Sequence, residues 1–153
     1  MDERLLDVDR YGVLRVPGLV WVSLIVLTRH WFLFFFMVFT GQALVGEKGA
    51  PWLPMLAQLP VVLLLLAGGR RMPEARPMIR QIWRMGPLLV SVTAVLNLAW
   101  MAWSLYVSDD WRLRPELMLV CFSVLDTLIA WSTFTSQHVR QIFTEFPAGS
   151  EAK

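Results

Sequence analysis

Four stretches of almost uninterrupted apolar residues dominate the chain, and short polar segments separate them. A bilayer core about 30 Å thick is crossed by about 20 apolar residues in an α-helix. Each stretch meets or approaches that length, so the pattern predicts an all-α integral membrane protein, an antiparallel four-helix transmembrane bundle forming a single domain over residues 1–153. The predicted spans are 18–40, 51–68, 86–107 and 115–134, followed by a tail over 135–153.

Prolines and glycines punctuate these spans. Several of them stand at span starts, where a missing N–H costs nothing: Pro17, Gly18, Gly86, Pro87 and Pro115. Pro60 instead lies inside the second span. It should free the carbonyl of Leu56, which predicts a kink in that helix.

Two polar segments carry an amphipathic pattern. In the second loop, arginines recur every four residues and apolar residues oppose them, which predicts a brief helix with Arg76, Arg80 and Arg84 on one side and Ile79, Ile82 and Trp83 on the other. The tail places four apolar residues on one helical face: Val139, Ile142, Phe143 and Phe146. This spacing predicts that the tail prolongs the fourth span as a helix on the membrane surface.

The distribution of cations predicts the orientation of the chain. Ten of the 14 Lys and Arg residues lie in the N-terminal segment, the second loop and the tail, and three lie in the first and third loops. Positive charge collects on the cytoplasmic side, so both termini should be cytoplasmic. Interfacial aromatics agree: Trp21, Trp83 and Trp131 should mark the cytoplasmic interface, and Trp52, Trp103, Tyr106 and Trp111 the opposite one.

Composition narrows the class of protein further. The chain is 56% hydrophobic and 17% charged, against about 25% charged residues in an average soluble domain. Its N-terminal 15 residues are too acidic for a secretory leader, so we expect the first span to be retained. Cys121, the single cysteine, excludes an intrachain disulfide. The chain lacks phosphate loops, catalytic carboxylate pairs and metal-ligand spacings, so we expect no enzyme, no metal and no cofactor. Its basic patch is short and interrupted by apolar residues, so we expect no nucleic-acid partner.

The most informative feature is a set of polar residues at matching depth in the four spans: Arg29, His30, Gln58, Asn97 and Asp126. A polar side chain in hydrocarbon is costly, so each should face protein rather than lipid. The first and fourth spans run antiparallel, and Arg29 and Asp126 both lie near half depth. We therefore expect a buried ion pair between them, with the other three side chains completing its hydrogen bonds.

Two interpretations of this cluster compete. It is either a structural clasp that fixes how the helices pack, or a proton or ion pathway or polar substrate site, since ionisable groups inside a membrane often mark function. A single pair without a second carboxylate favours the clasp. His30 similarly has two interpretations: a titrating or haem-ligating residue, or a hydrogen-bonded packing residue, which the neighbouring Arg29 favours.

The basic second loop and the aromatic half of the first span suggest contacts. The loop arginines, Arg70, Arg71, Arg76, Arg80 and Arg84, either bind anionic lipid headgroups or only set the topology. The aromatic run from Trp31 to Phe39 either packs and contacts lipid or docks another membrane subunit. We therefore expect a non-catalytic accessory or scaffold subunit that binds a larger membrane assembly or itself. The alternative is a small transporter or channel component that uses the polar cluster.

The beginning of the chain also shows a family likeness. A D-R-Y-G-V-L-R-V-P entry precedes an arginine in the first span, and the residues that carry the pattern are Tyr11, Gly12, Leu14, Arg15, Pro17 and Arg29. This opening resembles that of the YfeZ-like group of small bacterial inner-membrane proteins, whose function is unknown. The resemblance implies a four-span, multi-pass protein of the bacterial inner membrane and implies no activity.

Overall fold

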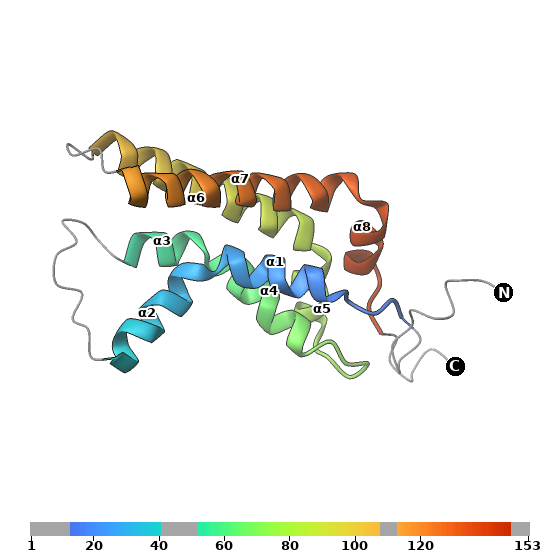
Figure 1. The fold of residues 1–153 in the computed structure, drawn as a ribbon. Coiled ribbons are helices and arrows are strands. Elements are labelled where there is room, and N and C mark those ends of the chain that lie inside the picture. The colour runs from blue at the N-terminus through green and yellow to red at the C-terminus, as the bar shows by residue number, and fades with distance from the viewer. Residues whose placement is uncertain (1–12, 41–51, 108–112, 148–153) are drawn as a thin grey trace, which may run out of the picture.

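The computed structural model describes residues 13–40, 52–107 and 113–147, and these residues form α-helices without any β-strand. The all-helical class predicted from the sequence is therefore confirmed for this part of the chain. Several residues used above lie outside it, including Tyr11, Gly12, Pro51 and Trp111. The helices, in order, are α1 Gly18–Leu27, α2 Arg29–Thr40, α3 Trp52–Ala57, α4 Leu59–Gly69, α5 Pro77–Arg84, α6 Gly86–Val107, α7 Leu113–Thr135 and α8 Gln137–Thr144 (Figure 1).

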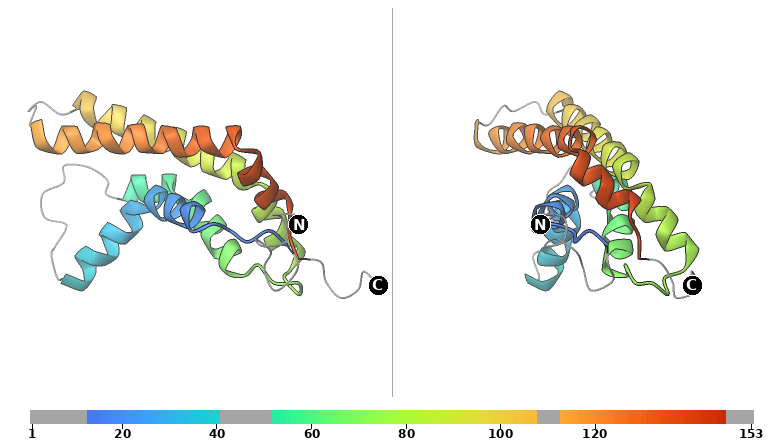
Figure 2. Two further views of the ribbon diagram at one scale, coloured as in Figure 1. Left: turned by 45° about the vertical axis from the view of Figure 1, so that its right-hand side comes forward. Right: turned by 90° about the vertical axis from the view of Figure 1, so that its right-hand side faces the viewer.

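Helices α6 and α7 form a long antiparallel pair, and α1 and α4 lie along one side of it (Figures 1 and 2). The apolar core lies between these helices and includes Leu24, Leu27, Val61, Leu64 and Val90. Helix α6 has the bounds predicted from hydropathy, residues 86–107. Helix α7 extends beyond the predicted 115–134 at both ends.

The first predicted span is not one continuous helix. It breaks at Thr28, and α2 leaves the direction of α1 by 66° (Figure 1). No glycine or proline stands at the break. Instead, the Thr28 hydroxyl donates to the carbonyl oxygens of Leu24 and Ile25 at 3.1 and 3.0 Å, so it caps the last turn of α1. The prediction of an unbroken helix over 18–40 was wrong.

The second predicted span breaks as well, at Gln58 between α3 and α4. Pro60 lies in the first turn of α4, where its missing N–H costs nothing. The helix is interrupted at Gln58, two residues before the proline, as Pro60 led us to expect.

Length and composition alone would let one of the described helices, α6, cross a membrane. Helices α1 and α2 pass the same test only together, despite the bend between them. Helix α4 and the Val120–Thr135 part of α7 are apolar but shorter. The two breaks are the reason that two of the predicted spans do not count as single helices, so the number of crossings stays a prediction.

The tail does not prolong α7. Ser136 ends that helix and caps the next one, because its side chain accepts a hydrogen bond from the Val139 N–H at 3.4 Å. Helix α8 then turns back against α5 and α6, and it buries Ile142 and Phe143 completely (Figure 1). The apolar face of the tail is thus covered by the chain itself. The prediction that this face contacts lipid was wrong, because it packs against α5 and α6 instead.

Trp83 of α5 packs against α8 at the end of the bundle where these two helices meet. It was expected at the membrane interface but is fully buried, and its indole N–H donates to the Ile142 carbonyl at 2.9 Å. Its ring lies 5.0 Å from that of Phe143. The Phe143 ring rests directly on Gly86, where any β-carbon would collide with it. The close approach of α8 to the start of α6 therefore requires glycine at this position.

Candidate functional site

The five mid-depth polar residues come together at one place, where the breaks at Thr28 and Gln58 face α6 and α7. Arg29 makes a two-pronged ion pair with Asp126: Nη1 lies 2.8 Å from Oδ1, and Nη2 lies 3.0 Å from Oδ2. The Asp126 side chain is fully buried and that of Arg29 is 11% exposed. The pairing expected from their matching depth is present in the structure. A fork of this kind is the strongest geometry for a guanidinium and a carboxylate.

Two amides extend the ion pair across the bundle. The Asn97 Nδ2 group donates to Oδ2 of Asp126 at 3.1 Å, and the Gln58 Nε2 group donates to Oδ1 of Asn97 at 3.3 Å. Asn97 and Gln58 are both buried. The cluster therefore connects α7 to α6, and α6 to the break between α3 and α4.

The hydrogen bonds run in series from His30 through Gln58 and Asn97 to Asp126. The groups at the two ends of this series decide which atom donates in each bond. At one end, the backbone N–H of His30 can only donate, and it does so to Oε1 of Gln58 at 3.2 Å. At the other end, the Asp126 carboxylate accepts from Arg29 and from Asn97. Both ends orient the amides in the same sense, so the Gln58 Nε2 group faces Nδ1 of His30, 2.6 Å away. Nδ1 must then accept, which makes His30 a neutral imidazole carrying its proton on Nε2.

The cluster also adds side-chain hydrogen bonds to backbone carbonyls beside the two helix breaks. A helix end leaves carbonyl or N–H groups without partners, which is costly where water is absent. Arg29 donates a further hydrogen bond to the Val26 carbonyl at the end of α1, at 3.3 Å. The Trp31 indole N–H donates to the Met55 carbonyl at the end of α3, at 2.9 Å. The bond from Arg29 is local to the first break, whereas the bond from Trp31 reaches the second break from the facing segment.

This arrangement suits packing better than acid–base chemistry. Both Asp126 oxygens accept hydrogen bonds from the Arg29 guanidinium, so the carboxylate is held in a fixed orientation. No group of three or more His, Cys, Asp or Glu residues that could hold a metal ion occurs within the described residues. The Arg29 guanidinium is covered by the Phe122 ring, 4.7 Å from its centroid, which screens the pair from that side.

Two threonines belong to the site in addition to the five residues predicted for it. Thr28 stands at the break beside Arg29 and caps the last turn of α1. Thr93 is completely buried on α6, one turn from Asn97, and its hydroxyl has no hydrogen-bond partner in the described part of the chain. A polar residue one helical turn from an intramembrane amide was the available signal for Thr93.

The basic loop divides into two kinds of arginine. Arg71 is buried, and its guanidinium donates to the Leu14 carbonyl at 2.8 Å and to the Glu145 carbonyl at 2.9 Å. The Leu14 N–H in turn donates to the Glu145 carboxylate at 3.0 Å. Arg71 therefore holds the entry segment and the tail together.

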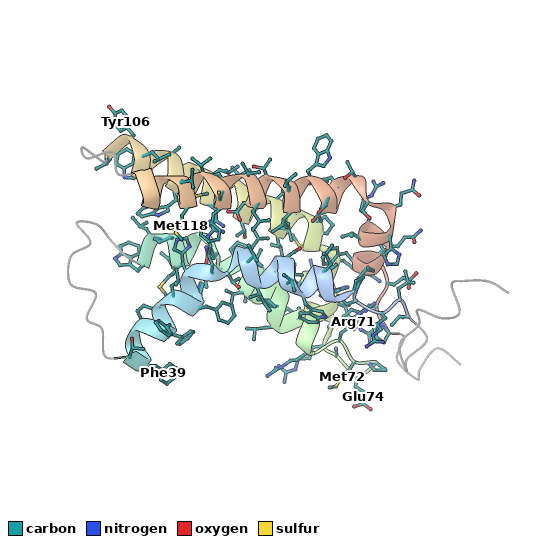
Figure 3. All side chains as sticks on the ribbon, viewed as in Figure 1. Phe39, Arg71, Met72, Glu74, Tyr106 and Met118 are labelled. Atoms are coloured by element: carbon teal, nitrogen blue, oxygen red, sulfur yellow. The ribbon has the colours of Figure 1, made fainter. Side chains whose placement is uncertain are left out.

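Arg80 is also engaged within the protein. Its guanidinium donates to the Pro73 carbonyl at 2.6 Å and lies over the Phe146 ring at 5.6 Å. Arg71 and Arg80 were both expected among the lipid contacts, and the structure corrects this because their side chains bind backbone and aromatic groups. Figure 3 shows Arg71 and the neighbouring Met72 and Glu74 at one end of the molecule, far from Tyr106 at the end of α6. Arg70, Arg76 and Arg84 are exposed.

Comparisons with known proteins agree with the likeness seen in the opening residues. The chain is 31% identical over 149 residues to the inner membrane protein YfeZ of Escherichia coli (strain K12), a match that covers 90% of this chain and 91% of that protein. No solved structure matches the chain. Residues 4–145 match the family model described as "Protein of unknown function (DUF2919)". The resemblance to the YfeZ-like group is thereby confirmed, and the chain belongs to the DUF2919 family.

Proposed function

We propose that this chain is a multi-pass protein of the bacterial inner membrane that acts as a non-catalytic accessory or scaffold subunit. Its four crossings would be α1 with α2, α3 with α4, α6 and α7, with both termini in the cytoplasm. The location is supported by the name of the E. coli relative. Residues 52–69 would span about 27 Å at 1.5 Å per helical residue, close to the thickness of a bilayer core.

The observation that carries the structural role is the buried carboxylate of Asp126, both oxygens of which accept hydrogen bonds from neighbouring helices. It accepts two hydrogen bonds from Arg29 and one from Asn97, and it is fully buried. A group that binds or transfers a ligand needs an open approach, which the burial of this side chain does not provide. Asp126 instead binds α7 to α6 and to the start of α2, which is what a clasp requires.

Helix α2 supports a role in assembly. It leaves the bundle at the break, and four of its aromatic side chains are exposed: Phe32, Phe35, Phe36 and Phe39. Phe39 lies at the far end of α2, away from the other helices (Figure 3). An exposed aromatic face on a divergent helix offers contact area for an apolar helix of a second membrane protein.

Purification of the full-length chain in a mild detergent tests the accessory role. Wild type should carry a membrane protein in fixed stoichiometry, and Phe36→Asn on α2 should release it. Leu128→Asn is the matched control, because Leu128 is similarly exposed but lies on α7. A wild-type chain that purifies alone as a monomer, or a partner retained equally by both variants, would contradict the proposal.

A second candidate is a small transporter or channel component. It is favoured by the two helix breaks, which meet at the polar cluster. Broken helices at membrane depth are tolerated where they are buried in protein or line a cavity, and transporters place binding sites at such breaks. Thr93→Cys in a Cys121→Ser background separates the two: labelling by a membrane-impermeant maleimide favours the transporter, and protection favours the clasp.

A further inference from the structure

Three arginines remain available at the end of the molecule where α4, α5 and α8 meet. Arg70 and Arg76 lie in the segment between α4 and α5, and Arg84 ends α5. All three are exposed, unlike Arg71 and Arg80 from the same loop. Among the described residues the ion pair between Arg29 and Asp126 is the one salt bridge, so no described carboxylate neutralises these three cations.

Exposed methionines accompany these arginines. Met78 and Met85 are 70% and 41% exposed, and Met72 is exposed in the loop before α5 (Figure 3). Large apolar side chains between the cations of a surface that faces only water would be unfavourably hydrated. Alternating cations and flexible apolar side chains instead suit the boundary between lipid headgroups and acyl chains.

The methionines also continue the outer face of α6. Helical hydrogen bonding runs through the junction, since the Met85 N–H donates to Gln81 and the Met85 carbonyl accepts from Leu89, both at 3.0 Å. Met78 and Met85 therefore fall on one face with Leu88, Val92 and Val95, which are also exposed. Helix α6 has the length and composition to cross a membrane, so this stripe would pass from its lipid-facing side to the level of the headgroups.

We propose that Arg70, Arg76 and Arg84, together with Met78 and Met85, form a binding surface for anionic phospholipids. The guanidinium groups would bind headgroup phosphates, whose oxygens match the planar fork of arginine. The methionines would contact the upper acyl chains. This surface goes beyond the accessory role, because residence in a membrane does not by itself require selection of anionic lipid.

The test is competition between lipids on the full-length chain. Protein released from micelles containing equal amounts of phosphatidylglycerol and phosphatidylcholine is weighed by native mass spectrometry, which gives the enrichment of the anionic lipid. Each arginine near the surface contributes about 1 kcal/mol, or about fivefold in affinity. The double variant Arg76→Gln/Arg84→Gln should therefore lower the enrichment about 25-fold.

A matched control removes the same charge elsewhere. Arg15 and Arg140 are exposed on the entry segment and α8, so Arg15→Gln/Arg140→Gln should leave the enrichment within about twofold of wild type. Met78→Ser/Met85→Ser should weaken retention of both lipids while preserving the preference for the anionic one. Equal losses in the two arginine double variants, a wild type without preference, or displacement of the lipid by inorganic phosphate would overturn the proposal.

Discussion

Replacing Asp126 by alanine should be among the most damaging single changes in this chain. The substitution removes the acceptor for both prongs of Arg29 and for Asn97. Arg29 keeps only its hydrogen bond to the Val26 carbonyl, and its charge stays in a site where its side chain is 11% exposed. An unpaired buried charge, rather than the lost attraction, is the main source of the expected cost.

The magnitude follows from that unpaired charge. Removing one partner of a buried ion pair costs about 3–5 kcal/mol, and we expect about 3 here because Arg29 retains one hydrogen bond. Arg29→Leu should cost a similar amount, because it leaves the carboxylate of Asp126 buried without its cation. The double variant removes both charges, so it should be about 2 kcal/mol less destabilised than the sum of the single variants.

Reversible unfolding in mixed micelles measures these free energies for wild type, the two single variants and the double variant. The amount of each protein that accumulates in the membrane should follow the same order as its stability. Thr127→Ala is the control: Thr127 is the adjacent residue, is exposed, and bonds only to the Ser123 carbonyl of its own helix. Its cost should stay within about 0.5 kcal/mol. Strictly additive single changes, or an Asp126→Ala variant as stable as Thr127→Ala, would refute the clasp.

Two further outcomes are expected. Gly86→Ala should lower the free energy of unfolding by about 1–3 kcal/mol, because the added methyl collides with the Phe143 ring. Gly69→Ala is the control and should be neutral or stabilising, because its added methyl meets no atom within 4 Å. Thermal melting of both variants checks this, and equal melting temperatures would contradict it. Nitrogen-15 NMR of the labelled chain should show His30 neutral with its proton on Nε2, as the contact with Gln58 requires. A protonated Nδ1 would show that the hydrogen bonds run the other way.

Hydropathy predicted the long helices, and depth matching predicted the ion pair. The bounds of α6 follow from its apolar run alone. Arg29 and Asp126 could be paired because each lies near the middle of its span, and few alternatives exist for a charge in hydrocarbon. Both features follow from which side chains are apolar and which are charged, and the sequence shows this directly.

The break at Thr28 could not be predicted in the same way. No local residue forbids a helix there, and apolar side chains continue on both sides. Its stability depends on a tertiary contact, because Gln58 caps the freed His30 N–H from another segment. Pro60 did predict the facing break, since proline acts locally.

The end of the bundle where α5 and α8 meet was predicted incorrectly for a related reason. An amphipathic helix has the same pattern whether its apolar face meets lipid or protein, so the burial of Phe143 was not visible in the sequence. The role of Arg71 depends on the carbonyls of Leu14 and Glu145, which are distant in the chain. A count of the Lys and Arg residues in each loop cannot distinguish a buried arginine such as Arg71 from an exposed one.

The number and direction of the crossings test the account most directly. Single cysteines in a Cys121→Ser background can be placed in segments 41–50 and 108–112 and at Glu74, then exposed on intact cells to a membrane-impermeant thiol reagent. Four crossings with cytoplasmic termini predict labelling at the first two segments and, at Glu74, labelling only after the membrane is opened. Labelling of Glu74→Cys on intact cells, or protection of both segments, would contradict the proposed topology.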